Sequence, residues 1–112
     1  MPVNVEFTPE FKRNVRALSK KYRHIRSDVD PLIVDLQSGQ FPGDQVTGTG
    51  YTIFKVRVPN RDVRKGKSGG YRLIYYLQTK ADIILITIYS KTEQADVSAL
   101  QIRRIVAEFE AS

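Results

Sequence analysis

Four basic side chains fall on, or directly after, three consecutive stretches with the alternating pattern of β-strands. Neighbouring strands lie about 4.8 Å apart, so side chains on one face of a sheet can converge on a single phosphate group. Arginine offers a planar fork that matches phosphate oxygens, and lysine offers a compact charge. Such cations can hold an RNA phosphate and stabilise the negative charge that develops when the neighbouring 2′-OH attacks it. The candidates for this role are Lys55, Arg57, Arg72 and Lys91.

The same stretches carry tyrosines, which could stack RNA bases and so align the attacking hydroxyl. Tyr76 and Tyr89 are the candidates for base stacking. For Tyr71 and Tyr75 we favour the alternative that the rings belong to the core of the sheet.

Positive charge sits in two blocks of the chain. The 112 residues carry 18 Lys and Arg against 12 Asp and Glu, a net charge of +6. Residues 11–26 contain seven basic residues and no acid, and residues 55–72 contain seven basic residues and one acid. Because nearby like charges repel, these blocks indicate surfaces for a polyanion or an acidic partner, although a solvated helix face explains the first block equally well. Further RNA-binding candidates are Lys12, Arg16, Lys20, Arg61, Arg64, Lys65 and Lys67.

Composition and spacing exclude several other kinds of site. The absence of Cys excludes a disulfide framework, a zinc finger and a thiol nucleophile, and is typical of a cytoplasmic protein. The run Gly66-Lys67-Ser68 matches the end of a P-loop, but Arg61 stands where that motif needs glycine and a strand follows in place of a helix. His24 is the only histidine and lacks a close carboxylate in the sequence, which excludes a paired-histidine nuclease. Without an acidic cluster or a long apolar run, we expect no metal, no cofactor and no membrane contact.

Three helices are predicted from apolar residues that recur at helical spacing, and the first two should form a hairpin joined by a short turn. Local capping patterns mark their boundaries. These patterns are Thr8-Pro9 at the start of the first helix, Ser27 with Asp30 at the start of the second, Gly39 at its end, and Ser98 with Gln101 at the start of the last.

The predicted elements follow the order β-α-α-β-β-β-α in a single domain, residues 1–112. Short connections between the last three strands imply an antiparallel meander. We therefore expect a small α+β fold in which an antiparallel sheet carries an N-terminal helical hairpin and a C-terminal helix. The helices should pack on one face of the sheet, with Lys55, Arg57 and Arg72 on the other. The predicted strands are residues 3–7, 53–58, 71–77 and 83–89, and residues 39–51 should form a loop.

Two motifs in the basic strands carry a family resemblance. One is Gly-Lys-x-Gly-Gly-x-Arg, which ends at Arg72, and the other is Ile-Tyr-x-Lys-x-Glu, which ends at Glu93. With the segment Lys-Val-Arg-Val that begins at Lys55, they resemble the RelE/ParE superfamily of type II toxin–antitoxin systems, and in particular its HigB-like branch. The resemblance covers nearly the whole chain and implies the RelE/ParE toxin-like α+β fold. It further implies an mRNA endonuclease that enters the ribosomal A site and cuts without a metal, by attack of the 2′-OH.

The resemblance also assigns catalytic roles. Arg72 corresponds to the family's arginine on the third strand, the transition-state ligand. Lys55 and Arg57 correspond to the basic pair on the preceding strand, and Lys91 to a basic residue at the end of the last strand.

The chain departs from the best-studied relatives after Lys91. They have arginine where this chain has Thr92, and a tyrosine near the position of Asp96 and Val97, which HigB-like relatives generally lack too. The general base is therefore open between a lysine whose pKa is lowered by cationic neighbours and Glu93.

The partners implied by the resemblance are the ribosome with its mRNA, and a cognate antitoxin that covers the basic surface. The toxin–antitoxin complex would bind operator DNA through the antitoxin. Two other functions fit the same fold: a ParE-like inhibitor of DNA gyrase, and a non-catalytic module that binds RNA or DNA. Converging phosphate ligands argue against the gyrase inhibitor, because binding to a protein target does not need them.

Overall fold

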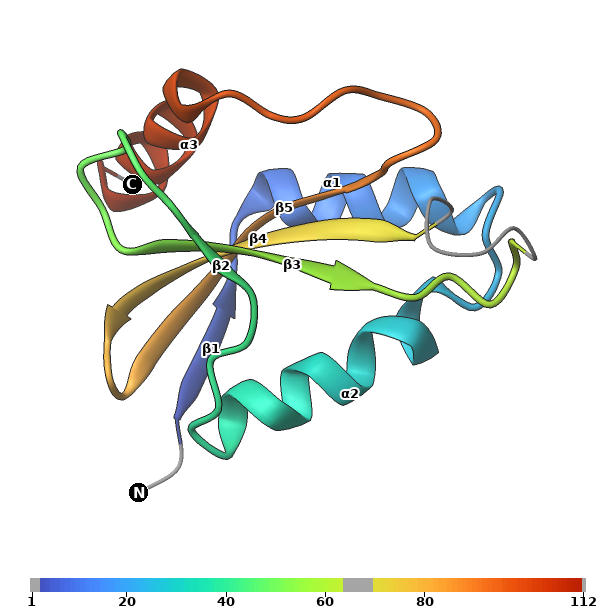
Figure 1. Ribbon diagram of the computed structural model, residues 1–112, viewed down its shortest axis with the longest axis horizontal. Helices are drawn as coiled ribbons and strands as arrows, with labels where there is room; N and C mark the ends of the chain where they lie inside the picture. The colour runs from blue at the N-terminus through green and yellow to red at the C-terminus, as the bar shows by residue number, and fades with distance from the viewer. Residues whose placement is uncertain (1–2, 64–69, 112) are drawn as a thin grey trace.

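The computed structural model describes residues 3–63 and 70–111. These residues form an α+β fold, as predicted, with three helices and a five-stranded sheet in the order β1-β5-β4-β3-β2 (Figure 1). None of the helices in these two ranges has the length and apolar character that crossing a membrane requires. In chain order the elements are β1 (Asn4–Phe7), α1 (Pro9–Ser19), α2 (Ile25–Gln37), β2 (Asp44–Val46), β3 (Ile53–Val58), β4 (Tyr71–Thr79), β5 (Asp82–Ser90) and α3 (Ala99–Ala111).

The sheet is mixed, which corrects the predicted antiparallel arrangement. β1 pairs in parallel with β5, from Asn4 opposite Asp82 to Phe7 opposite Leu85. The three other strand pairs are antiparallel. The apolar run 83–86 is buried, as expected of an interior strand, and β1 supplies the partner on its second edge.

A fifth strand, β2, lies inside the segment that was predicted to be a loop. It has three residues and pairs antiparallel with the start of β3, where Asp44 lies opposite Lys55. Asp44 and Gln45 are both polar and exposed, so no alternation of apolar and polar residues reveals this strand in the sequence.

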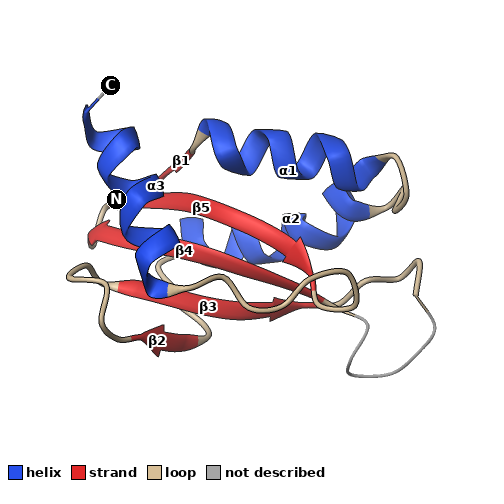
Figure 2. Ribbon diagram, turned by 90° about the horizontal axis from the view of Figure 1, so that it is seen from above, coloured by secondary structure: helices blue, strands red, loops and turns tan. Residues whose placement is uncertain are grey.

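The helices do not share one face of the sheet, contrary to the prediction. α2 buries Leu36 and its other apolar residues in the larger core, on one face. α3 packs Ile102 on the opposite face, in a second cluster that contains Ile74 of β4. α1 runs alongside β5 beyond the end of β1, where the Thr87 hydroxyl of β5 donates to Asn14 over 2.8 Å (Figure 2). α3 therefore packs on the face of the sheet that was predicted to carry only the cations.

Two of the predicted helix starts and the predicted helix end are confirmed. The N–H of Phe11 donates to Thr8 Oγ1 over 2.9 Å, which caps α1. At the start of α3, Ser98 and Gln101 exchange backbone-to-side-chain hydrogen bonds of 3.3 and 3.2 Å. Gly39 has a φ of 89°, a conformation that favours glycine, and it ends α2.

The predicted capping box at Ser27 and Asp30 is wrong. α2 begins at Ile25 with His24 at the N-cap, so Ser27 lies inside the first turn. Its hydroxyl donates backward to the carbonyl oxygen of His24 over 3.0 Å. The turn between α1 and α2 is therefore shorter than the sequence pattern indicates.

Candidate functional site

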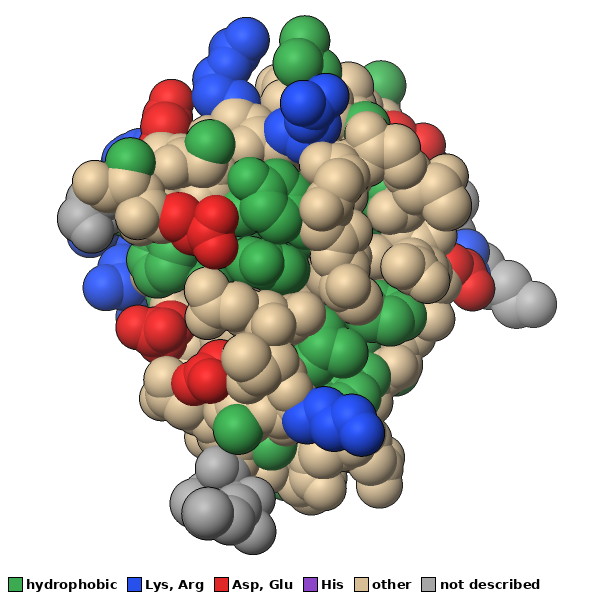
Figure 3. Space-filling view, turned by 90° about the vertical axis from the view of Figure 1, so that its left-hand side faces the viewer, with side chains coloured by type: hydrophobic (Ala, Val, Ile, Leu, Met, Phe, Trp, Pro, Cys, Tyr) green, Lys and Arg blue, Asp and Glu red, His purple; other side chains and the backbone are tan. Residues whose placement is uncertain are grey.

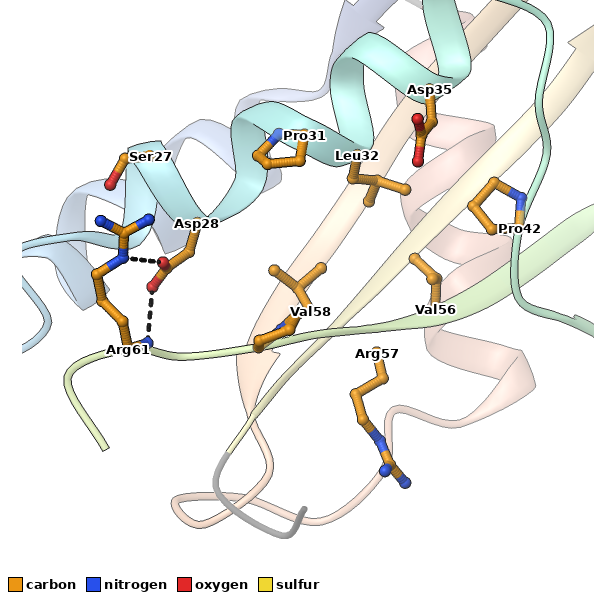
Figure 4. A pocket seen from close by; sticks show the side chains of 11 residues that line it. Ser27, Asp28, Pro31, Leu32, Asp35, Pro42, Val56, Arg57, Val58 and Arg61 are labelled. Carbon is orange, nitrogen blue, oxygen red and sulfur yellow. Dashed lines mark hydrogen bonds and ion pairs between the residues drawn. The ribbon is translucent and has the colours of Figure 1, made fainter. Parts of the chain in front are cut away.

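Alternation along β3 separates an apolar side from a basic side. Val56 and Val58 point toward α2, whereas Arg57 points to the opposite side of the strand (Figure 4). Lys55 shares the side of Arg57, because strand residues two apart lie on the same face. Arg57 lies directly opposite Arg72 on β4. The structure thus places three of the predicted cations on one face of two neighbouring strands.

Gly70 lets the backbone pass close to β3 beside the two arginines, at the end of the sheet. A Cβ at this position would lie 2.9 Å from the carbonyl oxygen of Val58, closer than Cβ atoms approach in proteins. It would also lie 3.6 Å from Arg57 Cγ and 3.7 Å from Arg72 Nη1, so both side chains flank the bare glycine backbone. The last glycine of the motif therefore has a steric role beside the two cations.

One carboxylate joins the lysines on this face. Asp96, in the loop between β5 and α3, accepts hydrogen bonds at Oδ1 from Lys91 Nζ over 2.9 Å and from the Tyr89 hydroxyl over 3.0 Å. Lys55 Nζ lies 3.8 Å from the same oxygen. The hydrogen bond from Lys91, and then the one from Tyr89, lower the pKa of Asp96 below its usual value. We call Lys55, Arg57, Arg72 and Lys91 the cation cluster, and Asp96 is its counter-ion.

The cation cluster carries an excess of positive charge. Among residues 3–63 and 70–111, neither Arg57 nor Arg72 has a carboxylate partner. Arg72 Nη1 donates to the carbonyl oxygen of Tyr71 over 3.3 Å. Four cations against one carboxylate leave a net charge of +3. The lysine side chains are only 36% exposed, so water screens their charge less than it screens a free lysine. Such a site can bind a phosphodiester and stabilise the additional charge of a pentacoordinate phosphorus.

The tyrosines differ in how far they are buried, and the prediction of base stacking is wrong for Tyr89. Tyr89 is 3% exposed, and a base cannot stack on a ring that the protein covers. Burial, followed by the hydrogen bond to Asp96, raises the pKa of Tyr89 to about 12, so its contribution to the site is a protonated hydroxyl. Tyr76 is half-buried, and its ring centre lies 5.2 Å from that of Tyr51. Tyr71 and Tyr75 are fully buried, which confirms the core interpretation.

Glu93, one of the two candidates for the general base, lies outside the cation cluster. Its carboxylate accepts a short hydrogen bond from the Tyr22 hydroxyl and lies 3.4 Å from Lys21 Nζ. The hydrogen bond from Tyr22 lowers the pKa of Glu93, which makes it a weaker proton acceptor. The chain turns directly after β5, where the Glu93 N–H donates to the carbonyl oxygen of Ser90, and Glu93 reaches the turn between α1 and α2. The other candidate for the general base that the sequence analysis left open is a lysine of the cation cluster.

The other RNA-binding candidates that lie in the described ranges are not gathered at the cation cluster. Arg61 binds Asp28 of α2 through its backbone N–H and its Nε, over 3.1 and 2.9 Å (Figure 4). The side chains predicted on the first helix are exposed on α1 or at its C-cap. These are Lys12, Arg16 and Lys20. Arg64, Lys65 and Lys67 lie outside the described residues.

His24 has a carboxylate partner, contrary to the expectation from the sequence. Its Nδ1 lies 2.7 Å from Asp62 Oδ1, and its backbone N–H donates to Asp62 Oδ2 over 3.0 Å. The backbone hydrogen bond from His24 lowers the pKa of Asp62. The two residues are 38 positions apart in the chain, so local spacing could not reveal the pair. In the described part of the chain, no group of three or more His, Cys, Asp or Glu side chains could hold a metal ion.

Other features of the surface differ in chemistry from the cation cluster. A hollow of about 400 Å³ lies between α2 and β3 and is lined by apolar side chains together with Asp28, Asp35, Arg57 and Arg61 (Figure 4). Figure 3 shows the side of the molecule on the left of Figure 1, where Lys and Arg stand in separate spots among hydrophobic and acidic side chains. The strand segments that carry Arg57 and Arg72 or directly precede Lys91 are the ends of β3 and β5 and the start of β4. They lie on the opposite side, on the right of Figure 1.

Asp96 is the site residue that the sequence analysis did not identify as functional. It was noticed only as a position where studied relatives have a different residue. The available signal was its place as an acid shortly after Lys91, but contact with Lys55 depends on the fold. No model of a known protein family matches the chain.

Proposed function

We propose that this protein is a toxin of the RelE/ParE superfamily that cleaves mRNA on the ribosome. The observation that carries the proposal is the cation cluster, in which Arg57 and Arg72 are paired across two strands and two lysines meet at one oxygen. An anion that enters this face meets charges from three strands or their ends.

The cluster supports a metal-free reaction at an RNA phosphodiester. The 2′-oxygen of the preceding nucleotide forms a bond to phosphorus, and the bond from phosphorus to the 5′-oxygen breaks. Arg57 and Arg72 stay protonated, so they act as fixed ligands for the non-bridging oxygens and stabilise the charge that develops there. A lysine ammonium of the cluster protonates the departing 5′-oxygen, and the 2′-OH proton passes to solvent. The products are a 2′,3′-cyclic phosphate and a 5′-hydroxyl end.

We propose that the protein acts as part of a type II toxin–antitoxin pair, as the resemblance of its motifs implies. The exposed cations of α1 provide further charge for ribosomal RNA, and an antitoxin would neutralise the basic surface. A gyrase inhibitor of the same fold makes no use of a phosphate site, so the cation cluster favours the nuclease.

Expression of the protein in growing bacteria tests this proposal directly. We expect new 5′-hydroxyl ends inside translated reading frames, and none in the same transcripts when their start codons are removed. Sequencing of RNA ends before and shortly after induction measures this. Growth arrest with a DNA-damage response and intact transcripts would instead indicate the gyrase inhibitor, and normal growth would indicate a non-catalytic module.

A further inference from the structure

We propose that Asp96 is an internal substitute for the substrate phosphate, and that an RNA phosphate displaces it from the cation cluster. This inference rests on the proposed function and concerns regulation of the same site. The carboxylate oxygen that contacts Lys91, Tyr89 and Lys55 would take the position that a phosphate oxygen of the RNA uses.

The contacts of Asp96 are those expected for a bound phosphate oxygen. A single oxygen, Oδ1, accepts from the Lys91 ammonium over 2.9 Å and from the Tyr89 hydroxyl over 3.0 Å, and lies 3.8 Å from the Lys55 ammonium. The two hydrogen-bond donors come from β5 and from the residue directly after it, and the ammonium of the longer ion pair comes from β3. An oxygen that faces polar groups from separate strands is also what a cluster built for a phosphodiester would need.

Displacement of Asp96 requires little rearrangement of the protein. The Asp96 side chain is 52% exposed, so solvent is available on one side when it rotates away from the lysines. The adjacent Val97 packs against the second core cluster and holds the loop in place. Exposed ion pairs contribute little net stability, so an RNA that brings several charged oxygens can compete with one carboxylate.

Asp96 would also hold the two lysines of the cation cluster together before RNA binds. Without an anion, the ammonium groups of Lys55 and Lys91 would repel each other across the end of the sheet. The carboxylate holds both near one point, in the arrangement that a phosphate later uses. It would also weaken the binding of other anions to the cation cluster, because they would have to replace a counter-ion that is already present.

Replacement of Asp96 by asparagine tests the inference. We expect Asp96→Asn to bind a 2′-O-methyl RNA oligonucleotide, which cannot be cleaved, about 5-fold more tightly than the unchanged protein. Asp44→Asn is the matched control, because Asp44 is exposed and lies opposite Lys55 in the strand register but has no ion-pair partner among the described residues. Near physiological salt, the control should change affinity less than about 2-fold. Fluorescence anisotropy with the purified full chain measures both, and circular dichroism checks that the variants are folded.

The possible results separate this inference from the proposed function. If Asp96→Asn binds RNA no more tightly than Asp44→Asn, or more weakly, Asp96 does not compete with phosphate and the inference is wrong. If Asp96→Asn binds more tightly but the unchanged protein cuts no mRNA on ribosomes, the phosphate site stands and the nuclease proposal fails. If cleavage is normal and the affinities of the variants are equal, the nuclease proposal stands and only the inference fails.

Discussion

Arg72→Ala is expected to reduce mRNA cleavage by about 100- to 1000-fold, the loss typical when one ligand of a developing oxyanion is removed. Arg72 lies on the cation face of the central strand β4, opposite Arg57 and without a carboxylate partner in the described ranges. Its full charge is therefore available to the phosphate. Initial rates of cleavage in a reconstituted translation system, measured with ribosomes stalled on a defined message, give the ratio.

The fold should survive this substitution, so that lost activity reports on chemistry. The Arg72 side chain is partly exposed, and its only hydrogen bond in the described residues is to the adjacent Tyr71 carbonyl. We expect the free energy of unfolding to change by about 0.5 kcal/mol. Arg103→Ala, at an exposed position of α3, is the control for loss of an arginine charge and should cleave normally. Full activity of Arg72→Ala would show that the catalytic face has been misassigned.

The affinity for single-stranded RNA is expected to depend steeply on salt. If the cation cluster and the exposed cations of α1 together neutralise about four phosphate charges, counter-ion release lowers the affinity about 50-fold between about 50 and about 200 mM salt. Titration of the uncleavable oligonucleotide at several salt concentrations measures the slope. Arg72→Ala should make the dependence of the RNA affinity on salt less steep, by the amount that one phosphate contact contributes. An affinity that stays constant over this range would contradict binding through phosphate.

Local features of the structure could be predicted from the sequence because neighbouring residues determine them. Thr8 caps α1, and Ser98 with Gln101 caps α3, through hydrogen bonds between residues three apart. The basic face of β3 likewise follows from alternation alone, since Lys55 and Arg57 are two residues apart. These interactions need no information about the rest of the fold.

The features that the sequence did not reveal depend on contacts between distant segments. Parallel pairing of β1 with β5 joins residues that are 78 positions apart, as in the hydrogen bond from Thr8 to the Ile86 carbonyl next to that pairing. The side of the sheet that α3 covers depends on the path of the loop that follows β5. That same loop brings Asp96 to Lys55, whereas the motif that ends at Glu93 had made Glu93 the acidic candidate of the site.

A message with a single 2′-deoxynucleotide on the 5′ side of the mapped cleavage site tests the central claim most directly. Removing this hydroxyl removes the proposed nucleophile but leaves the phosphate and its contacts with the cation cluster in place. We expect cleavage at that bond to disappear, while the ribosome-bound protein still protects the site as it protects the unmodified message. Continued cleavage of the modified bond would show that water or another nucleophile attacks the phosphate, and would contradict the mechanism proposed for the cluster around Arg72.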